Sequence, residues 1–208
     1  MANTTFSGAV RSKGGFTSIS ENSSTGAIST LSSISSTGVS SFDANTMAVE
    51  AGTGITGGTG TIYRSSVQRV GGIITTRILI DLTGLRSTAS GDIIGVDGTS
   101  NVCHIGQITA ARNGTILTGS MECFEAPAGG DPDINVHSAT EGTGVEDGAI
   151  SSLTETLLVN AGDATLGSKV YFTAVPAADE FLYLTLGDTT NADYTAGKLF
   201  IELMGYEA

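Results

Sequence analysis

The segment IITTRILIDL, residues 73–82, decides the fold class of this chain. It is rich in β-branched residues, and Ile78, Ile80 and Leu82 stand two positions apart, so they share one face of an extended chain. In a helix, Ile80 would point away from the other two. The segment therefore predicts a half-buried strand of an antiparallel sheet.

Two segments near the end of the chain repeat this pattern. They are FLYLTLG, residues 181–187, and KLFIELM, residues 198–204, where Lys198 and Glu202 alternate with apolar residues. The residues predicted to face the core are Leu182, Leu184, Leu186, Leu199, Ile201 and Leu203. Short strands separated by Gly, Asp and Asn predict an all-β domain over residues 46–208, either an antiparallel β-sandwich or a jelly-roll-like barrel.

Turn signals place the strands between these segments. Asn113-Gly114 separates NVCHIGQITAAR from TILTGSMECF and predicts a hairpin, because Asn-Gly suits a two-residue turn between strands. Asp97-Gly98 predicts a second hairpin with a weaker signal. Residues 152–159 have the spacing of a capping box, which indicates a short helix, but a strand fits them nearly as well.

Residues 1–45 differ from the rest of the chain. The stretch SISENSSTGAISTLSSISSTGVSSF has isolated apolar residues, and the spacing of three between Ile28, Leu31 and Ile34 fits neither a regular strand nor a helix for long. Such a segment buries too little apolar surface to fold alone. We expect an extended Ser/Thr/Gly-rich N-terminal arm that orders against another surface, with free disorder as the alternative.

The charge of the chain is strongly acidic and unevenly distributed. The net charge is -12, which argues against nucleic acid as a direct partner. Residues 1–112 hold seven basic and six acidic residues, whereas residues 113–208 hold two basic and fifteen acidic ones. We expect the acidic C-terminal half to face solvent. No signal-peptide core and no apolar run of about 20 residues is present, so we expect synthesis in a host cytoplasm and no membrane partner.

Several short motifs resemble parts of ligand-binding sites, but each lacks residues or a following element that such a site requires. Residues 52–57 match GxGxxG, but more glycine and a strand pattern follow where a dinucleotide site needs a helix. Asp131-Pro132-Asp133 begins like a calcium loop but lacks the Gly and Glu that an EF-hand requires. A calcium site of another kind, using Glu141, Glu146 and Asp147, stays open. No cofactor is predicted.

The two cysteines and two histidines have no zinc-motif spacing. With a two-residue turn at Asn113-Gly114, Cys103 faces Phe124 and both thiols are free. With a three-residue loop, Cys103 stands opposite Cys123. We favour the first register and two buried free thiols.

No catalytic site is predicted, because the chain has no nucleophile elbow and no paired histidine motif. Among the acidic residues, Asp81 and Glu202 lie within predicted strands, where a perturbed pKa is easier to produce. Solvent-facing strand positions explain both equally well. We therefore expect a structural protein and no enzyme.

The opening MANTTFSGAVRSKGGF, the strand IITTRILIDLTGL with DIIGVDG and HIGQIT after it, and the ending TAGKLFIELMGY resemble virion structural proteins of marine tailed bacteriophages. The resemblance implies a small β-rich structural protein of the virion. A capsid decoration (cement) protein of this kind binds the major capsid protein on the outer capsid surface, commonly as a homotrimer.

The neutral N-terminal arm suits an adhesive role in such a protein, and its candidate capsid-binding residues are Phe6, Arg11, Lys13 and Phe16. A tail or fibre component is the main alternative, although fibre shafts usually show long repeats. A carbohydrate-binding β module is the second alternative, but with no Trp and five Tyr the chain has few aromatic rings for stacking on sugars.

Overall fold

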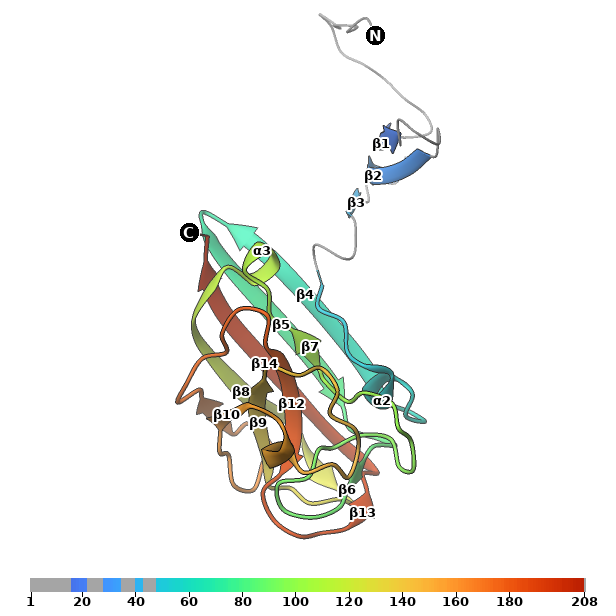
Figure 1. Ribbon diagram of the computed structural model, residues 1–208, viewed down its shortest axis with the longest axis vertical. Coiled ribbons are helices and arrows are strands. Elements are labelled where there is room, and N and C mark those ends of the chain that lie inside the picture. The colour runs from blue at the N-terminus through green and yellow to red at the C-terminus, as the bar shows by residue number, and fades with distance from the viewer. Residues whose placement is uncertain (1–15, 22–27, 35–39, 43–47, 208) are drawn as a thin grey trace, which may run out of the picture. The chain divides into compact units, whose positions relative to one another are not determined.

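The computed structural model describes residues 16–21, 28–34, 40–42 and 48–207 (Figure 1). The chain divides into two compact units, residues 1–47 and residues 48–208. In the first unit, β1 (Phe16–Glu21), β2 (Ile28–Ile34) and β3 (Ser40–Phe42) form an antiparallel sheet in the order β1-β2-β3. Ile28, Leu31 and Ile34 all lie in β2, and the pairing with β1 shifts register at Leu31, so the spacing of three occurs in a strand that is not regular, as expected.

The predicted capsid-binding residues fall mostly outside the described part of the chain. Phe6, Arg11 and Lys13 lie outside the described residues, and Phe16 is the first residue of β1. The role of residues 1–45 as an arm stays a prediction.

The second unit is a sandwich of two antiparallel sheets, as predicted. The five-stranded sheet has the order β11-β8-β14-β5-β4, and its strands are β11 (Lys169–Tyr171), β8 (Thr115–Ala128), β14 (Ala196–Tyr206), β5 (Ile73–Asp81) and β4 (Ile62–Val70). The four-stranded sheet has the order β10-β9-β12-β7, with β10 (Glu155–Val159), β9 (Ile134–Ala139), β12 (Phe181–Leu186) and β7 (Gly106–Gln107). Over residues 48–207 neither sheet closes on itself, so the barrel alternative is wrong.

Short elements complete the sandwich. A two-stranded ribbon pairs β6 (Arg86–Ser87) with β13 (Ala192–Asp193). In residues 48–207 the helices are single turns: α2 (Thr53–Thr56), α3 (Ala110–Asn113) and the 3-10 turn η1 (Ile150–Ser152). Within the described residues, no helix is both long and apolar enough to cross a membrane. Residues 152–159 take the strand alternative for the most part, since β10 covers Glu155–Val159.

The predicted alternation in the five-stranded sheet is confirmed. Ile78 and Ile80 of β5 pair with Ile201 and Leu199 of β14, and all four side chains are fully buried. Figure 1 shows β5 and β14 side by side along their whole length. Burying these side chains removes apolar area from water, which is the main stabilising term of such a core.

Strand β12 is more deeply buried than the half-buried strand that the sequence predicts. Leu182, Leu184 and Leu186 face the core as expected, but Tyr183 and Thr185 on the other face are also fully buried. Loops cover that second face. The Tyr183 hydroxyl donates a hydrogen bond to the carbonyl of Glu141 at 2.7 Å and accepts one from the backbone N–H of Gly144 at 3.2 Å.

The hairpin predicted at Asn113-Gly114 does not form. Residues 106–107 belong to the four-stranded sheet, and α3 then carries the chain across to β8 in the five-stranded sheet. Asn113 is the last residue of α3, and Gly114 has a φ of 67°, which a glycine adopts without strain. Strand β8 pairs with β14 and β11. Both registers proposed for Cys103 and Cys123 are therefore wrong.

The weaker hairpin at Asp97-Gly98 is also wrong. Gly98 does form a turn with a φ of 66°, but the flanking residues pair elsewhere. Ile93 forms its bridge with Thr185, and Val102 forms one with Val145. Long-range pairing therefore prevails over the local turn signal at both sites.

Candidate interaction face

The side chains of the five-stranded sheet that point away from the four-stranded sheet form a broad, flat surface, which we call the outer face. Because the register is known, its residues can be followed in rows across the strands. One row joins Arg64, Leu79, Phe200, Glu122 and Lys169. The neighbouring rows are Ile62–Asp81–Lys198–Glu125, Ser66–Arg77–Glu202–Ser120–Tyr171, Gln68–Thr75–Met204–Thr118 and Val70–Ile73–Tyr206–Thr115.

The outer face is apolar for a solvent-facing surface. Of the eleven large hydrophobic residues that are exposed within the described part of the chain, eight lie on strands of this sheet. They are Ile62, Val70, Ile73, Leu117, Phe124, Tyr171, Met204 and Tyr206. Near the centre, the rings of Phe124 and Phe200 stack at a centroid distance of 5.1 Å with an angle of 9° between planes. Exposed apolar side chains gathered on one sheet in this way are typical of interaction sites.

The outer face is also neutral, whereas the remainder of the domain is acidic. Residues 48–207 carry seven basic and nineteen acidic residues. The outer face holds four of each, namely Arg64, Arg77, Lys169, Lys198, Asp81, Glu122, Glu125 and Glu202. The rest of the domain keeps three basic and fifteen acidic residues. Charge thus separates by face as well as by chain half, and strands β8, β14 and β11 from the acidic half share the neutral outer face with β4 and β5.

Cross-strand ion pairs organise the charges of the outer face. Nε of Arg77 lies 2.8 Å from Oε2 of Glu202, and Nζ of Lys169 lies 3.5 Å from Oε2 of Glu122. Lys198 contacts both Asp81 and Glu125. Opposite charges on neighbouring strands stabilise a sheet modestly and leave the surface without a net field.

Asp81 and Glu202, the two carboxylates that the sequence analysis considered for chemistry, both belong to these ion pairs. Burial alone would raise the pKa of Asp81, but hydrogen bonds from Thr83 and the charge of Lys198 outweigh it and hold that pKa below its usual value. The hydrogen bond from Lys198 to Glu125 raises the pKa of the lysine. These shifts favour the charged forms and fit structural ion pairs better than acid–base catalysis.

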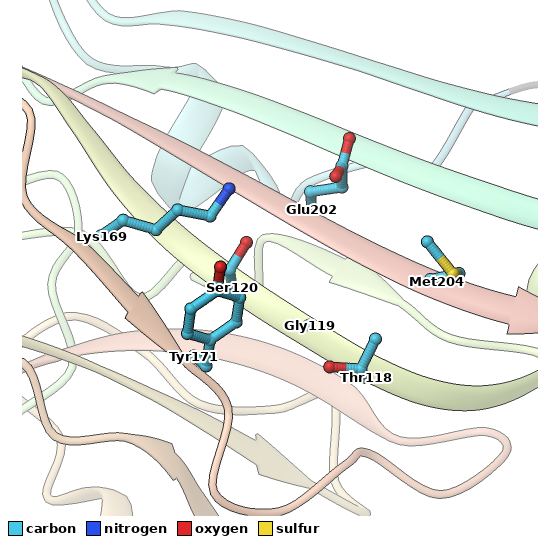
Figure 2. Close-up of a pocket in the computed structure, with 7 residues that line it drawn as sticks. All are labelled: Thr118, Gly119, Ser120, Lys169, Tyr171, Glu202 and Met204. Carbon is cyan, nitrogen blue, oxygen red and sulfur yellow. The ribbon is translucent and has the colours of Figure 1, made fainter.

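A shallow hollow of about 230 Å³ interrupts the outer face (Figure 2). Figure 2 shows Lys169 and Tyr171 beside Ser120 on one side, and Glu202 and Met204 on the adjacent strand β14. Tyr171 is 66% exposed, and Nζ of Lys169 lies 5.8 Å from the centroid of its ring. An exposed ring next to a hollow can anchor a side chain of a partner.

The outer face is not evident from the sequence alone. Its apolar residues at Leu79 and Phe200 stand at positions where strict alternation calls for polar residues. The uninterrupted apolar runs ILI (78–80) and LFI (199–201) therefore indicate strands with apolar side chains on both faces of the sheet. Only the strand order brings these two runs together with Phe124 and Tyr171 from other parts of the chain.

The acidic residues considered for calcium do not form one site. Oδ1 of Asp131 accepts a hydrogen bond from the backbone N–H of Asp133, and Oδ2 accepts one from Thr190, each at 2.9 Å. Glu141 instead accepts two hydrogen bonds from Thr154. Among residues 48–207 and the described parts of the first unit, no group of three or more His, Cys, Asp or Glu residues is placed to hold a metal ion.

The cysteines and histidines considered for zinc are separate as well. Both thiols are buried and free, as the favoured reading predicts, although the hairpin behind that reading is absent. Burial raises the pKa of Cys103 to about 12, so its thiol stays protonated at neutral pH and is a poor ligand or nucleophile. His137 pairs with Glu155 at 2.7 Å, and His104 packs against Phe181.

The GxGxxG segment has a structural role. Gly52 and Gly54 donate backbone hydrogen bonds to the carbonyls of His104 and Val102. A Cβ atom at Gly52 would lie 2.1 Å from the oxygen of Val102, and one at Gly54 would lie 2.4 Å from the sulfur of Cys103. Glycine is required here because two backbone segments approach closely, and α2 is a single turn with no strand in residues 48–52 directly before it.

One buried carboxylate lies outside the outer face and leads to a stability prediction. Glu146 is 8% exposed, and its Oε1 atom has no hydrogen-bond partner. Burial raises its pKa, and the nearby charges of Asp147 and Asp97 raise it further. Because its pKa is raised on folding, its contribution to stability is full below the unfolded pKa and is lost as the pH rises through the folded pKa.

We therefore expect Glu146→Gln to raise the melting temperature at pH 7 by about 2–4 °C, which corresponds to about 1 kcal/mol. The gain should shrink toward pH 4, where the wild-type carboxyl is protonated. Glu141→Gln is the matched control, because hydrogen bonds from Thr154 lower the pKa of Glu141 and its replacement should destabilise the protein at pH 7. Thermal unfolding at both pH values tests this, and an equal effect of Glu146→Gln at both would contradict it.

Comparison with known proteins identifies no relative: no family model matches the chain, and neither a curated protein nor a solved structure matches it significantly. The resemblance to phage virion proteins, the absence of an enzymatic role, the partners and the location all stay predictions.

Proposed function

We propose that this protein is a virion structural protein that decorates and stabilises the capsid of a tailed phage by binding the major capsid protein. The observation that supports the proposal best is the outer face, which is apolar and neutral on a domain that is otherwise strongly acidic. The resemblance of the chain ends and of residues 73–85 to virion proteins gives the biological setting.

The charge distribution favours this use of the outer face. Many copies attached close together on a particle repel one another if acidic surfaces meet, and they repel least when those surfaces point to solvent. Attachment through the neutral outer face produces that orientation. The apolar side chains of this face supply the affinity, and its internally paired charges cost less to remove from water than unpaired charges would.

The N-terminal arm is proposed as a second contact. Phe6, Arg11, Lys13 and Phe16 combine aromatic rings with basic groups in a chain that is otherwise acidic. An arm that pairs with a sheet edge or lies in a groove of the capsid satisfies its backbone groups as it binds. The homotrimer that the resemblance implies stays a prediction.

Removal of residues 1–20 should abolish binding to capsids while residues 48–207 stay folded. The experiment adds full-length or truncated protein back to particles stripped of it, then measures co-sedimentation and the heat resistance of the particles. Full-length protein should bind and restore heat resistance. Normal binding by the truncated protein would contradict the arm model, and failure of the full-length protein to bind would contradict decoration altogether.

The main alternative, a tail or fibre component, differs in copy number. A protein of the head lattice is present in hundreds of copies per particle, and one of the tail in a few dozen or fewer. Quantitative mass spectrometry of purified particles, scaled to the major capsid protein, separates the two. A carbohydrate-binding module is the second alternative, and absence of the protein from purified particles would favour it.

A further inference from the structure

Strand β4 is an edge strand with an open side. It pairs with β5 over all nine residues, from Ile62 opposite Asp81 to Val70 opposite Ile73, without a register shift. Within the described residues, its backbone makes no backbone hydrogen bond outside that pairing. Apart from the carbonyl of Tyr63, which accepts a hydrogen bond from Nη1 of Arg64 at 3.0 Å, a row of N–H and C=O groups along its other side is therefore available to another strand.

The other sheet edges lack this length or regularity. Strands β11 and β7 have three and two residues, and β10 has a register shift between Leu157 and Val159. Short strands and bulges are the usual means of preventing edge pairing. Strand β4 is nine residues long, has no bulge in its pairing with β5 and contains no proline.

The sequence of β4, IYRSSVQRV, complements itself when two copies run antiparallel. If the outer faces of both copies are to lie on the same side of the joint sheet, each outer-face residue of β4 must stand opposite an outer-face residue of the second copy. This requirement restricts the register. The register that uses all nine residues places Ser66 opposite Ser66 of the second copy. Ile62 then meets Val70 of the second copy, and these side chains are 44% and 75% exposed in the single chain.

The charges of β4 also fit this register. The strand has two arginines and no carboxylate. In the register centred on Ser66, Arg64 stands opposite Gln68 of the second copy, and Arg69 stands opposite Tyr63. The two Arg64 side chains are then separated by four residues along the strands, or roughly 13 Å, which exceeds the screening length of about 8 Å at physiological salt. No like charges meet.

We propose that β4 is a dimerisation edge, through which a second copy of this chain pairs antiparallel about Ser66. The two five-stranded sheets then form one ten-stranded sheet, and the two outer faces become one continuous neutral surface. A two-fold pairing closes with two copies, so it predicts a dimer instead of the homotrimer that the resemblance implies. The proposal does not depend on capsid binding.

The test measures the mass of the full-length chain in solution by light scattering over a range of concentrations. We expect twice the chain mass of 21.0 kDa at high concentration. Gln68→Glu places a carboxylate opposite Arg64 of the second copy and should tighten the dimer. Gln68→Arg places like charges opposite each other at two symmetric positions and should weaken it about tenfold. Adding Arg64→Glu to the Gln68→Arg variant should restore the dimer.

A matched control separates self-association from folding. Gln68 also accepts a hydrogen bond from Arg77, so Gln68→Arg alters a contact within the chain. Thr75→Arg introduces the same charge one strand inward in the same row, away from the edge, and should leave the dimer unchanged. A wild-type chain that is monomeric or trimeric at every concentration would overturn the proposal. So would equal dissociation constants for Gln68→Glu and Gln68→Arg.

Discussion

Phe200→Glu should weaken attachment to stripped capsids by at least about thirtyfold while leaving the fold intact. The expected loss follows from the position of Phe200 on β14, the middle strand of the five-stranded sheet, where it is stacked on Phe124 and flanked by Leu79 and Glu122. Truncating a central interface residue often costs about 2 kcal/mol or more, which is about thirtyfold in affinity. A carboxylate costs more, because it must lose its water and lies beside Glu122.

The control for this prediction is a pair of substitutions with the same chemistry and the same exposure. Met204 on the outer face is 39% exposed, and Leu157 on β10 of the other sheet is 38% exposed. Met204→Glu should reduce co-sedimentation with capsids, and Leu157→Glu should not. Equal binding by both variants would show that the outer face is not the attachment surface, whatever the role of the arm.

The strand faces were predictable from the sequence because they depend on local spacing. In β14 the alternation of Leu199, Ile201 and Leu203 with Lys198 and Glu202 is enough to identify the buried face. The outer face was not predictable in the same way. It depends on the order β11-β8-β14-β5-β4, and this order joins strands whose residues are up to 144 positions apart, as for Ile62 of β4 and Tyr206 of β14.

The Asn113-Gly114 error has a specific physical cause. Asn-Gly fits a tight turn through its backbone preferences, and those preferences are equally satisfied at the end of a helical turn. The burial of the Asn113 side chain distinguishes the two cases. At a hairpin tip it would contact water, whereas here it is completely buried. The residues around Asn113 in the sequence do not indicate this burial, because its side chain forms a hydrogen bond with Thr76, which lies on the distant strand β5.

Asn113→Ala should therefore destabilise the domain strongly, by about 3 kcal/mol. Oδ1 of Asn113 accepts a hydrogen bond from the backbone N–H of Thr109 at 2.9 Å, and its Nδ2 donates one to Oγ1 of Thr76 at 2.7 Å. Alanine leaves both partners unsatisfied in the interior, at about 1–3 kcal/mol for each buried group. For a domain of this size the melting temperature should fall by roughly 6–12 °C in thermal unfolding.

Two further variants identify the source of this loss. Asn101→Ala, at an exposed asparagine, should change the melting temperature little, because its side chain contacts solvent. Asn113→Asp keeps the acceptor for Thr109 but loses the donor to Thr76 and buries a carboxylate, so its stability should improve as the pH falls and the carboxyl is protonated. A small effect of Asn113→Ala would mean that residue 113 is solvated, as at a hairpin tip. In that case the crossover through α3, which carries the chain from one sheet to the other, would be wrong.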